Sequence, residues 1–199
     1  VASAVAMPRP RPIRPIRPSR HMRRIAGTTL FEILLTAAMA GVLASLAVPS
    51  LAGLRARTLV AGAAAAFESD LQQARAFAWA SGQVVHLAFR TASGGGGCYV
   101  LHTGEPGDCR CDAAQPAAAP VCDAGAQALR VAPWPAGSGV VLASNVASAT
   151  FDPLRGTVTP AFTLRLTGPQ SAALHQVVNV MGRVRTCTPD PSWKSWPGC

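Results

Sequence analysis

An uncharged apolar run of 22 residues, from Ile33 to Leu54, is the strongest hydrophobic feature of the chain. Glu32 is the only charged residue between positions 28 and 54. At about 1.5 Å per residue, a helix of this length can cross a lipid bilayer. Because arginines precede the run and none lies within it, the positive-inside rule predicts a cytoplasmic N-terminus and places the rest of the chain outside the cytoplasm.

A second apolar pattern, this time at helical spacing, follows the first run. Its members are Leu59, Val60, Ala63, Phe67, Leu71, Ala74 and Ala78. No Pro-Gly break separates this stripe from the first run, so we expect one long helix up to about Ala80, ended by Ser81-Gly82. The first half of this helix would lie in the membrane, and the second half would cover a sheet.

Alternating apolar and polar positions indicate β-strands in the rest of the chain. The strand-like runs lie at 83–90, 98–102, 128–132, 139–142, 161–167, 173–180 and 182–187. Together with the helix they predict an α+β fold, in which a long N-terminal helix packs on antiparallel β-sheet. The chain has 199 residues, of which 49% are hydrophobic, so it can form one modest core and one membrane segment but not two large domains.

The formal net charge of +9 is concentrated near the N-terminus. Seven of the eighteen Lys and Arg residues precede position 28, whereas all nine acidic residues follow it. Overall charge therefore does not by itself indicate nucleic-acid binding. Residues 8–20 alternate Pro with Arg, a composition that does not form a packed core. Since Met22 precedes a short basic stretch that would serve alone as a leader, we expect residues 1–21 to be disordered or to result from a misassigned start site.

Glu32 helps to choose between interpretations of the apolar run. A cleaved secretory signal would find small-residue sites at 42–44 and 45–47, but the run is too long and begins with a carboxylate. A plain membrane anchor would explain the length alone. An ionised carboxylate in a membrane segment costs about 2.5 kcal/mol or more and usually marks a function. We therefore expect Glu32 to have a cationic partner.

The residues from Gly27 to Glu32 (Gly-Thr-Thr-Leu-Phe-Glu), followed by an apolar helix with Gly41 and Pro49, resemble the N-terminus of a type IV prepilin. The resemblance implies cleavage after Gly27 by a prepilin peptidase and methylation of the new amino group on Thr28, where the family usually has Phe. It also implies that Glu32 pairs with the amino terminus of a subunit in the growing filament. Gly41 and Pro49 match positions where pilin helices bend or melt during assembly, although both residue types are also common in ordinary membrane helices.

The globular part resembles the GspH/FimT family of minor pilins and pseudopilins. The similarity lies in residues 70–75, in the strand after Gly82, and in the sequence Val-Val-Asn-Val-Met-Gly-Arg at 177–183. It does not cover the loop at 103–127.

This resemblance implies a type IV pilin-like architecture in three parts: a basic leader (1–27), a transmembrane and assembly helix (28–54), and a periplasmic globular domain (55–199). The chain would be a single-pass protein of the bacterial inner membrane before it enters a pilus or pseudopilus. Its expected partners are the prepilin peptidase, other pilins or minor pseudopilins, and the inner membrane.

Six cysteines follow the apolar run, an even number that suits an oxidising compartment. Of the fifteen possible pairings, we expect Cys187 with Cys199, which closes a C-terminal loop, and two bridges among Cys98, Cys109, Cys111 and Cys122. A bond between Cys109 and Cys111 is not expected across a single residue. That spacing also departs from zinc sites, whose paired cysteines are two to four residues apart, so no metal is expected.

Motifs typical of enzymes are missing from the sequence. His21, His86, His102 and His175 share no ligand spacing, and there is no Gly-rich phosphate loop, GxSxG elbow, HExxH motif or pair of carboxylates. We therefore expect no enzymatic activity and no cofactor.

The C-terminal segment contains a candidate nucleic-acid site. Arg183 and Arg185 are two positions apart, so on a strand both would project from one face and could clamp a phosphate backbone. Lys194 follows in the expected disulfide-closed loop, between two tryptophans that could stack on bases. The Gly-Arg-x-Arg sequence before a cysteine resembles the DNA-binding C-terminus of FimT-type minor pilins used in natural transformation. The alternative is that the arginines only solvate an edge strand and deter strand addition.

Two functions fit these features. The first is a FimT-like minor pilin that joins a pilus and captures double-stranded DNA for natural transformation. The alternative is a GspH-like minor pseudopilin of the type II protein secretion system, which would have the same anatomy but different partners. The Gly-Arg-x-Arg motif and the cysteine-closed tail favour the pilus.

Overall fold

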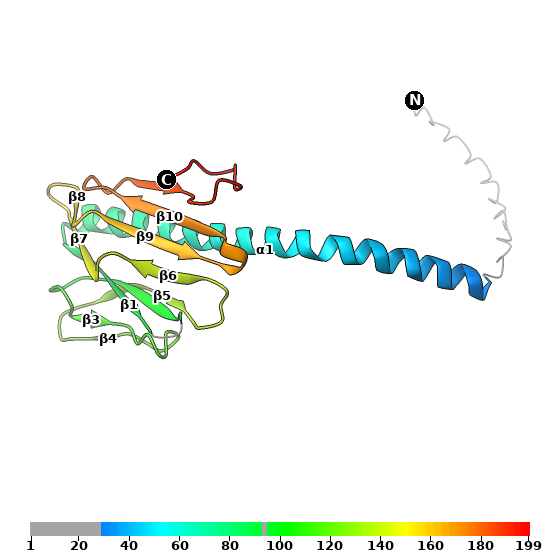
Figure 1. Ribbon diagram of the computed structural model, residues 1–199. Helices are drawn as coiled ribbons and strands as arrows, with labels where there is room; N and C mark the ends of the chain where they lie inside the picture. The colour runs from blue at the N-terminus through cyan, green and yellow to red at the C-terminus, as the bar shows by residue number, and fades with distance from the viewer. Residues whose placement is uncertain (1–28, 93–94) are drawn as a thin grey trace, which may run out of the picture. The chain divides into compact units, whose positions relative to one another are not determined.

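The computed structural model describes residues 29–92 and 95–199, and within 46–50 it describes only the backbone (Figure 1). The expected leader, including Gly27, and Thr28 lie outside the described residues. The chain forms two compact units, Val1–Leu43 and Ala44–Cys199, and the boundary between them falls within helix α1 (Leu30–Ser81).

Both ends of α1 follow from local chemistry. At its start the Glu32 backbone N–H donates to the Thr29 carbonyl at 3.0 Å and to Thr29 Oγ1 at 3.3 Å, as at a helix N-cap. The helix ends at Ser81, and Gly82 adopts a φ of +66°, a left-handed conformation that favours glycine after a helix. The end is where the sequence predicted it.

The helix is continuous through Gly41 and Pro49, so bending or melting at these positions during assembly stays a prediction. In the part of the chain that the structure describes, no helix is both long and apolar enough to cross a membrane.

Three antiparallel sheets follow the helix. The first has the order β5-β2-β1-β7-β8 and consists of β1 (Val85–Thr91), β2 (Gly97–His102), β5 (Ala128–Trp134), β7 (Ser148–Asp152) and β8 (Thr157–Thr159). The second has the order β11-β10-β9-β6 and consists of β6 (Val141–Ser144), β9 (Phe162–Thr167), β10 (Ala173–Val178) and β11 (Val184–Cys187). The third is a short hairpin of β3 (Cys109–Arg110) and β4 (Val121–Cys122), and a 3-10 turn, η1 (Pro169–Ser171), joins β9 to β10.

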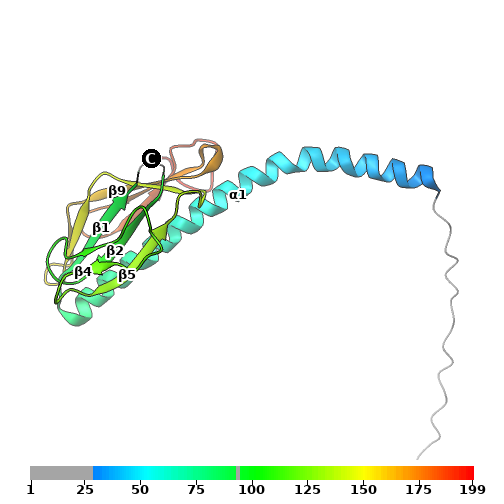
Figure 2. The same ribbon diagram turned by 90° about the horizontal axis from the view of Figure 1, so that it is seen from below.

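One hydrophobic core joins the C-terminal half of α1 to the inner faces of the two larger sheets (Figures 1 and 2). Phe67 lies fully buried in this core. Its ring contacts Phe89 of β1, Tyr99 of β2 and Phe162 of β9, with centroids 5.2–6.3 Å apart. Leu59 was expected on the buried stripe but is 40% exposed, because the buried side of α1 turns towards Ala56 and Val60 instead.

The core lies entirely within the second unit. Its buried members begin at Ala56 and end at Trp193. A polypeptide that starts at Arg55 therefore contains the whole core, and we expect it to fold without the preceding residues.

Two buried polar side chains fix α1 against the sheets. The Tyr99 hydroxyl of β2 donates to Asp70 Oδ2 on α1 at 2.7 Å, and Arg130 Nε of β5 donates to the same oxygen at 3.1 Å. On the other sheet, Gln176 Nε2 of β10 donates to the Ala64 carbonyl at 2.8 Å. Because a buried polar group without a partner costs about 1–3 kcal/mol, these bonds favour one rotation of the helix.

The loop at 103–127 covers the outer face of the five-stranded sheet. A second apolar cluster lies beneath it, formed by Ala88 and Val100 of the sheet and Cys109 of the loop. Two disulfides hold the loop in place, Cys98–Cys111 and Cys109–Cys122. Since this long loop buries few apolar side chains, the covalent links supply much of its stability.

Candidate nucleic-acid interface

A tight turn after β10 positions Arg183. The Asn179 side-chain oxygen accepts a hydrogen bond from the Arg183 backbone N–H at 2.9 Å, and the Asn179 N–H donates to the Arg183 carbonyl at 3.2 Å. Gly182 has a φ of +68°, and a Cβ there would lie 3.1 Å from both Arg75 and Val158, so the turn requires glycine. The glycine of the Gly-Arg sequence is thus needed for the turn, apart from any role of the arginine in binding phosphate.

Helix α1 supports this turn directly. The Arg75 guanidinium donates through Nη1 to the Gly182 carbonyl at 3.0 Å. The side chain of Arg183 remains exposed, next to the end of β10.

Arg185 lies on β11, an edge strand of the four-stranded sheet, opposite Val177 of β10. Its side chain is exposed, whereas Val178 and Leu174 on the opposite face of β10 are fully buried. Arg183 precedes the strand, so the two arginines are neighbours at one corner of the sheet rather than two rungs of one regular strand. Among the described residues, neither arginine has a carboxylate within ion-pair distance.

Lys194 lies in a different place. It belongs to the C-terminal loop that the Cys187–Cys199 disulfide closes, and it borders a groove beside Leu54 and Thr58 of α1. The turn before Arg183, by contrast, contacts Arg75 of α1. The groove beside Lys194 is also lined by residue 57 of α1, which is about 27 Å from residue 75 along the helix. The structure therefore does not bring Lys194 together with the two arginines.

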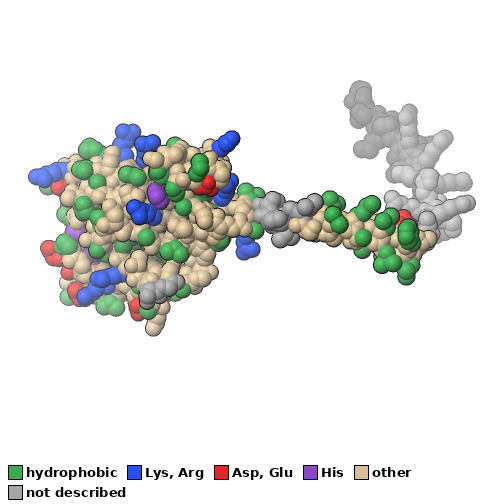
Figure 3. Space-filling view, in the orientation of Figure 1, with side chains coloured by type: hydrophobic (Ala, Val, Ile, Leu, Met, Phe, Trp, Pro, Cys, Tyr) green, Lys and Arg blue, Asp and Glu red, His purple; other side chains and the backbone are tan. Residues whose placement is uncertain are grey.

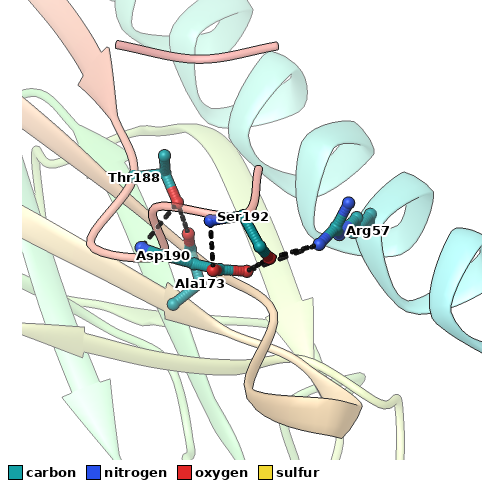
Figure 4. Close-up of polar contacts among 5 residues, drawn as sticks. All are labelled: Arg57, Ala173, Thr188, Asp190 and Ser192. Atoms are coloured by element: carbon teal, nitrogen blue, oxygen red, sulfur yellow. Dashed lines mark hydrogen bonds and ion pairs between the residues drawn. The ribbon is translucent and has the colours of Figure 1, made fainter. Parts of the chain in front are cut away.

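The C-terminal loop is anchored to α1 by Arg57 (Figure 4). Arg57 Nη2 donates to Ser192 Oγ at 2.8 Å and lies 3.5 Å from Asp190 Oδ2. The Arg57 guanidinium also lies over the Trp193 ring, 5.6 Å from its centroid. Trp193 is only 6% exposed and belongs to the core, so it is not available to stack on nucleic-acid bases as the sequence suggested.

Hydrogen bonds within the loop stabilise Asp190 as an anion. The Ser192 hydroxyl donates to Asp190 Oδ2 at 2.9 Å, and the Ser192 N–H donates to Oδ1 at 2.8 Å. These two bonds, together with the nearby Arg57 charge, lower the pKa of the Asp190 carboxyl. Thr188 holds the start of the loop, since its hydroxyl donates to the Ala173 carbonyl at 3.0 Å (Figure 4). The loop thus has a structural role next to the helix.

Glu32 lies in the first turn of α1 with its side chain exposed. Its expected partner is the amino terminus of another subunit, so its role in assembly stays a prediction. All six cysteines form disulfides, with Cys187 bonded to Cys199 and Cys109 bonded to Cys122 rather than Cys111.

A pair of buried histidines is a feature that linear spacing could not reveal. His86 of β1 and His102 of β2 are cross-strand partners beneath the 103–127 loop, with ring centroids 5.4 Å apart. Burial, and then the neighbouring His102, lower the pKa of His86. His86 Nδ1 lies 3.1 Å from Thr150 Oγ1 and His102 Nδ1 lies 3.0 Å from the Thr103 carbonyl, so both rings have structural partners. The pair could have been predicted only from the antiparallel register of β1 and β2, which places the two histidines opposite each other.

A long N-terminal helix packed on antiparallel sheets is the architecture of a pilin-like protein. A family model described as type II transport protein GspH matches residues 63–182. This match covers more than half of the chain, and the chain belongs to the GspH family. Searches of curated proteins and of solved structures found no match.

Membership makes the chain a minor pilin or pseudopilin of the GspH/FimT type, as its sequence resemblance implied. Members of such families are structural components that associate with other pilins or pseudopilins in a filament, rather than enzymes. The matched segment ends at Gly182, so Arg183 and Arg185 lie just beyond it.

Proposed function

We propose that this protein is a FimT-like minor pilin that captures double-stranded DNA for natural transformation. The observation that carries the proposal is the arginine corner, which we define as Arg183 and Arg185. Both side chains are exposed, and among the described residues no carboxylate neutralises them. Unpaired guanidinium groups that displace counterions from phosphates are the main source of affinity for DNA.

The corner is also rigidly presented. Its turn is held by the two Asn179 bonds to Arg183 and by the Arg75 bond to Gly182. Arginines on a preformed turn lose less conformational entropy on binding than arginines on a mobile tail. This rigidity supports a binding role over a purely solvating one.

Assembly into the pilus would use the N-terminal segment. We expect cleavage after Gly27, methylation at Thr28, and insertion of residues 28–54 in the inner membrane with the globular domain in the periplasm. The described part of this segment exposes large apolar side chains, among them Leu30, Phe31 and Ile33. Surfaces of this kind are normally covered by lipid or by neighbouring subunits. Glu32 would then pair with the amino terminus of another subunit.

A GspH-like minor pseudopilin of type II secretion is the second candidate. It is favoured by the description of the matching family, type II transport protein GspH. Both candidates share the pilin-like fold, and they differ in the partner bound by the globular domain. DNA binding is therefore the property that separates them.

The test is DNA binding by the oxidised domain from Arg55 onward, which also removes the arginine-rich residues 1–27. Fluorescence anisotropy with a labelled duplex would be measured across a salt series for the wild type and for Arg183→Ala/Arg185→Ala. If both arginines contact phosphate, the double substitution lowers the salt slope by about 2 and weakens binding at every sequence tested. Arg110→Ala is the matched control, because Arg110 is an exposed arginine on the opposite side of the fold, on the hairpin β3–β4. Absence of duplex binding by the folded wild-type domain would reject DNA capture and favour the pseudopilin.

A further inference from the structure

The outer face of the four-stranded sheet is partly open, and its strands contain no acidic residue. At the end of β11 the Cys187–Cys199 disulfide lies against this face, with Cys199 Sγ 3.7 Å from His175 Nδ1. The strands of the sheet read Val-Leu-Ala-Ser (β6), Phe-Thr-Leu-Arg-Leu-Thr (β9), Ala-Leu-His-Gln-Val-Val (β10) and Val-Arg-Thr-Cys (β11). Most of the alternate residues that face the core are buried, whereas Ala143, Arg165, Val177 and Arg185 on the outer face are exposed. We call this outer face, from β6 to β11, the cationic sheet face.

The register places a third arginine on this face. Arg165 of β9 lies opposite Ala143 of β6 on one side and His175 of β10 on the other. Arg185 lies opposite Val177 of β10, two residues along that strand from His175. Arg165 and Arg185 are therefore separated by two interstrand spacings and by two residues along the strand direction, which gives a Cα–Cα distance of about 12 Å.

From this arrangement we infer that the cationic sheet face is the DNA-binding surface, and that Arg165 contacts the phosphate backbone of the same duplex as Arg183 and Arg185. This inference rests on the proposed function and extends it from a corner to a surface. A separation of about 12 Å spans roughly three to four base pairs of rise, so one short stretch of duplex can meet both Arg165 and Arg185, and Arg183 lies only two residues before Arg185.

The position of Arg165 argues against a protective role. Arginine on an edge strand can deter pairing with another chain, and β11 is an edge strand. Arg165, however, lies on β9, which has β10 on one side and β6 on the other. Edge protection therefore explains Arg185 but not Arg165.

The charge of Arg165 is also available to a ligand. Its side chain is exposed, and in the described part of the chain it has no ion-pair partner. Its neighbour His175 adds no charge at neutral pH, because partial burial, and then the proximity of Arg165, lower the pKa of the imidazole. Figure 3 shows Lys and Arg side chains along the upper edge of the same domain.

The chemistry of the face selects duplex rather than single-stranded DNA. Single strands are held largely by aromatic side chains on which bases stack. The outward positions of β6, β9, β10 and β11 contain no Phe, Tyr or Trp, and Trp193 is buried in the core. Small outward side chains such as Ala143 and Thr163 leave the face low enough for a duplex backbone to approach the guanidinium groups.

The experiment compares Arg165→Gln with Arg165→Lys and Arg110→Gln in the oxidised domain from Arg55 onward. Anisotropy with a 30-base-pair duplex, and with each of its single strands, would be measured across a salt series (about one helical turn per 10 base pairs). Arg165→Gln should weaken duplex binding and lower the salt slope by about 1, whereas Arg165→Lys keeps the slope and Arg110→Gln changes neither quantity. Thermal unfolding followed by circular dichroism would verify that each variant is folded.

The outcomes separate this inference from the proposed function. If Arg183→Ala/Arg185→Ala loses binding while Arg165→Gln keeps the wild-type affinity and slope, the corner binds DNA and the sheet face does not. Tighter binding of the single strands than of the duplex would also overturn the sheet-face inference while DNA binding stands. If the folded wild-type domain binds no DNA at all, both the proposed function and this inference fail.

Discussion

The outer faces of the two large sheets have opposite properties. The face of the five-stranded sheet is covered by the 103–127 loop, which contains four of the nine acidic residues and a single cation, Arg110. The cationic sheet face leaves Ala143, Arg165, Val177 and Arg185 exposed, and its strands contain no acidic residue. The two faces have similar backbones, so the difference lies in what the sequence placed on them.

The difference shows why net charge is a poor guide to the charge of a local surface. After position 28 the chain has eleven basic and nine acidic residues, which looks nearly neutral. In the fold, four of the acidic residues lie in the loop on one side, and three arginines that have no ion-pair partner among the described residues lie around the other sheet. A nearly neutral domain can therefore present a locally basic surface.

The covered face should depend most on its disulfides. Replacing all four cysteines of Cys98–Cys111 and Cys109–Cys122 with alanine should lower the free energy of unfolding by about 2–4 kcal/mol per bridge, because each closes a loop of the unfolded chain. It should also expose the apolar cluster around Val100. Urea unfolding and hydrogen exchange at β2 would measure the two effects.

The Cys187–Cys199 bridge supplies the control, since its sequence separation of 12 is close to the 13 of the other two. Its removal should lower stability by a similar amount per bridge but leave exchange at β2 unchanged. Equal protection of β2 in both variants would show that the loop is held without its disulfides.

The stability of the contact between α1 and the five-stranded sheet should depend on pH through the hydroxyl proton of Tyr99. The contact of α1 with the four-stranded sheet should not. Burial, and then the hydrogen bond to Asp70, raise the pKa of Tyr99 above its usual value of 10.0. The unfolded chain therefore loses this proton near pH 10 while the folded chain keeps it. The stabilisation is complete below pH 10, and the free energy of unfolding should fall by about 1.4 kcal/mol per pH unit above it.

Tyr99 is the only tyrosine in the chain, so its ionisation can be followed directly by ultraviolet absorbance. Tyr99→Phe should remove this pH slope. A normal titration near pH 10 in the folded protein would contradict the prediction. Gln176, which links α1 to the other sheet, has no ionisable proton and serves as the comparison.

A carboxylate introduced on the cationic sheet face should reduce DNA binding. Ala143 is exposed and lies directly opposite Arg165, so Ala143→Glu would form an ion pair with it and repel phosphate. We expect a several-fold loss of affinity with little change in stability. Val121→Glu, at a 67% exposed position of β4, makes the same change in charge at a distant site and should have no effect.

The smallest effect is expected at Arg110. Its guanidinium lies 3.7 Å from Asp123, and both side chains are more than half exposed. Exposed pairs of this kind contribute about 0–1 kcal/mol, so Arg110→Ala should leave both the unfolding midpoint and DNA affinity nearly unchanged. A large loss of stability would mean that the hairpin β3–β4 depends on this pair as well as on its disulfides.

Local patterns predicted much of the fold. The helix end at Ser81, the buried stripe around Phe67 and the positions of seven strands follow from apolar periodicity and glycine chemistry. The strands β3, β4, β7 and β8 were missed, because segments of two to five residues are too short to be recognised alone. They exist because each pairs with a strand elsewhere in the chain, as β7 does with β1, and no local pattern encodes this pairing.

By itself, the sequence determined the fold class, the family and the closeness of Arg183 and Arg185, since each depends on residues close together in the chain. Only the tertiary structure decided which distant cations share a surface. Lys194 is nine positions from Arg185 in the sequence, but it lies beside Leu54 of α1, far from the turn before Arg183. Arg165 is twenty positions from Arg185, yet the two share one face of the sheet. The physical reason is that strand order and register, which are set by long-range hydrogen bonding and by burial of one face, bring residues together regardless of their separation in sequence.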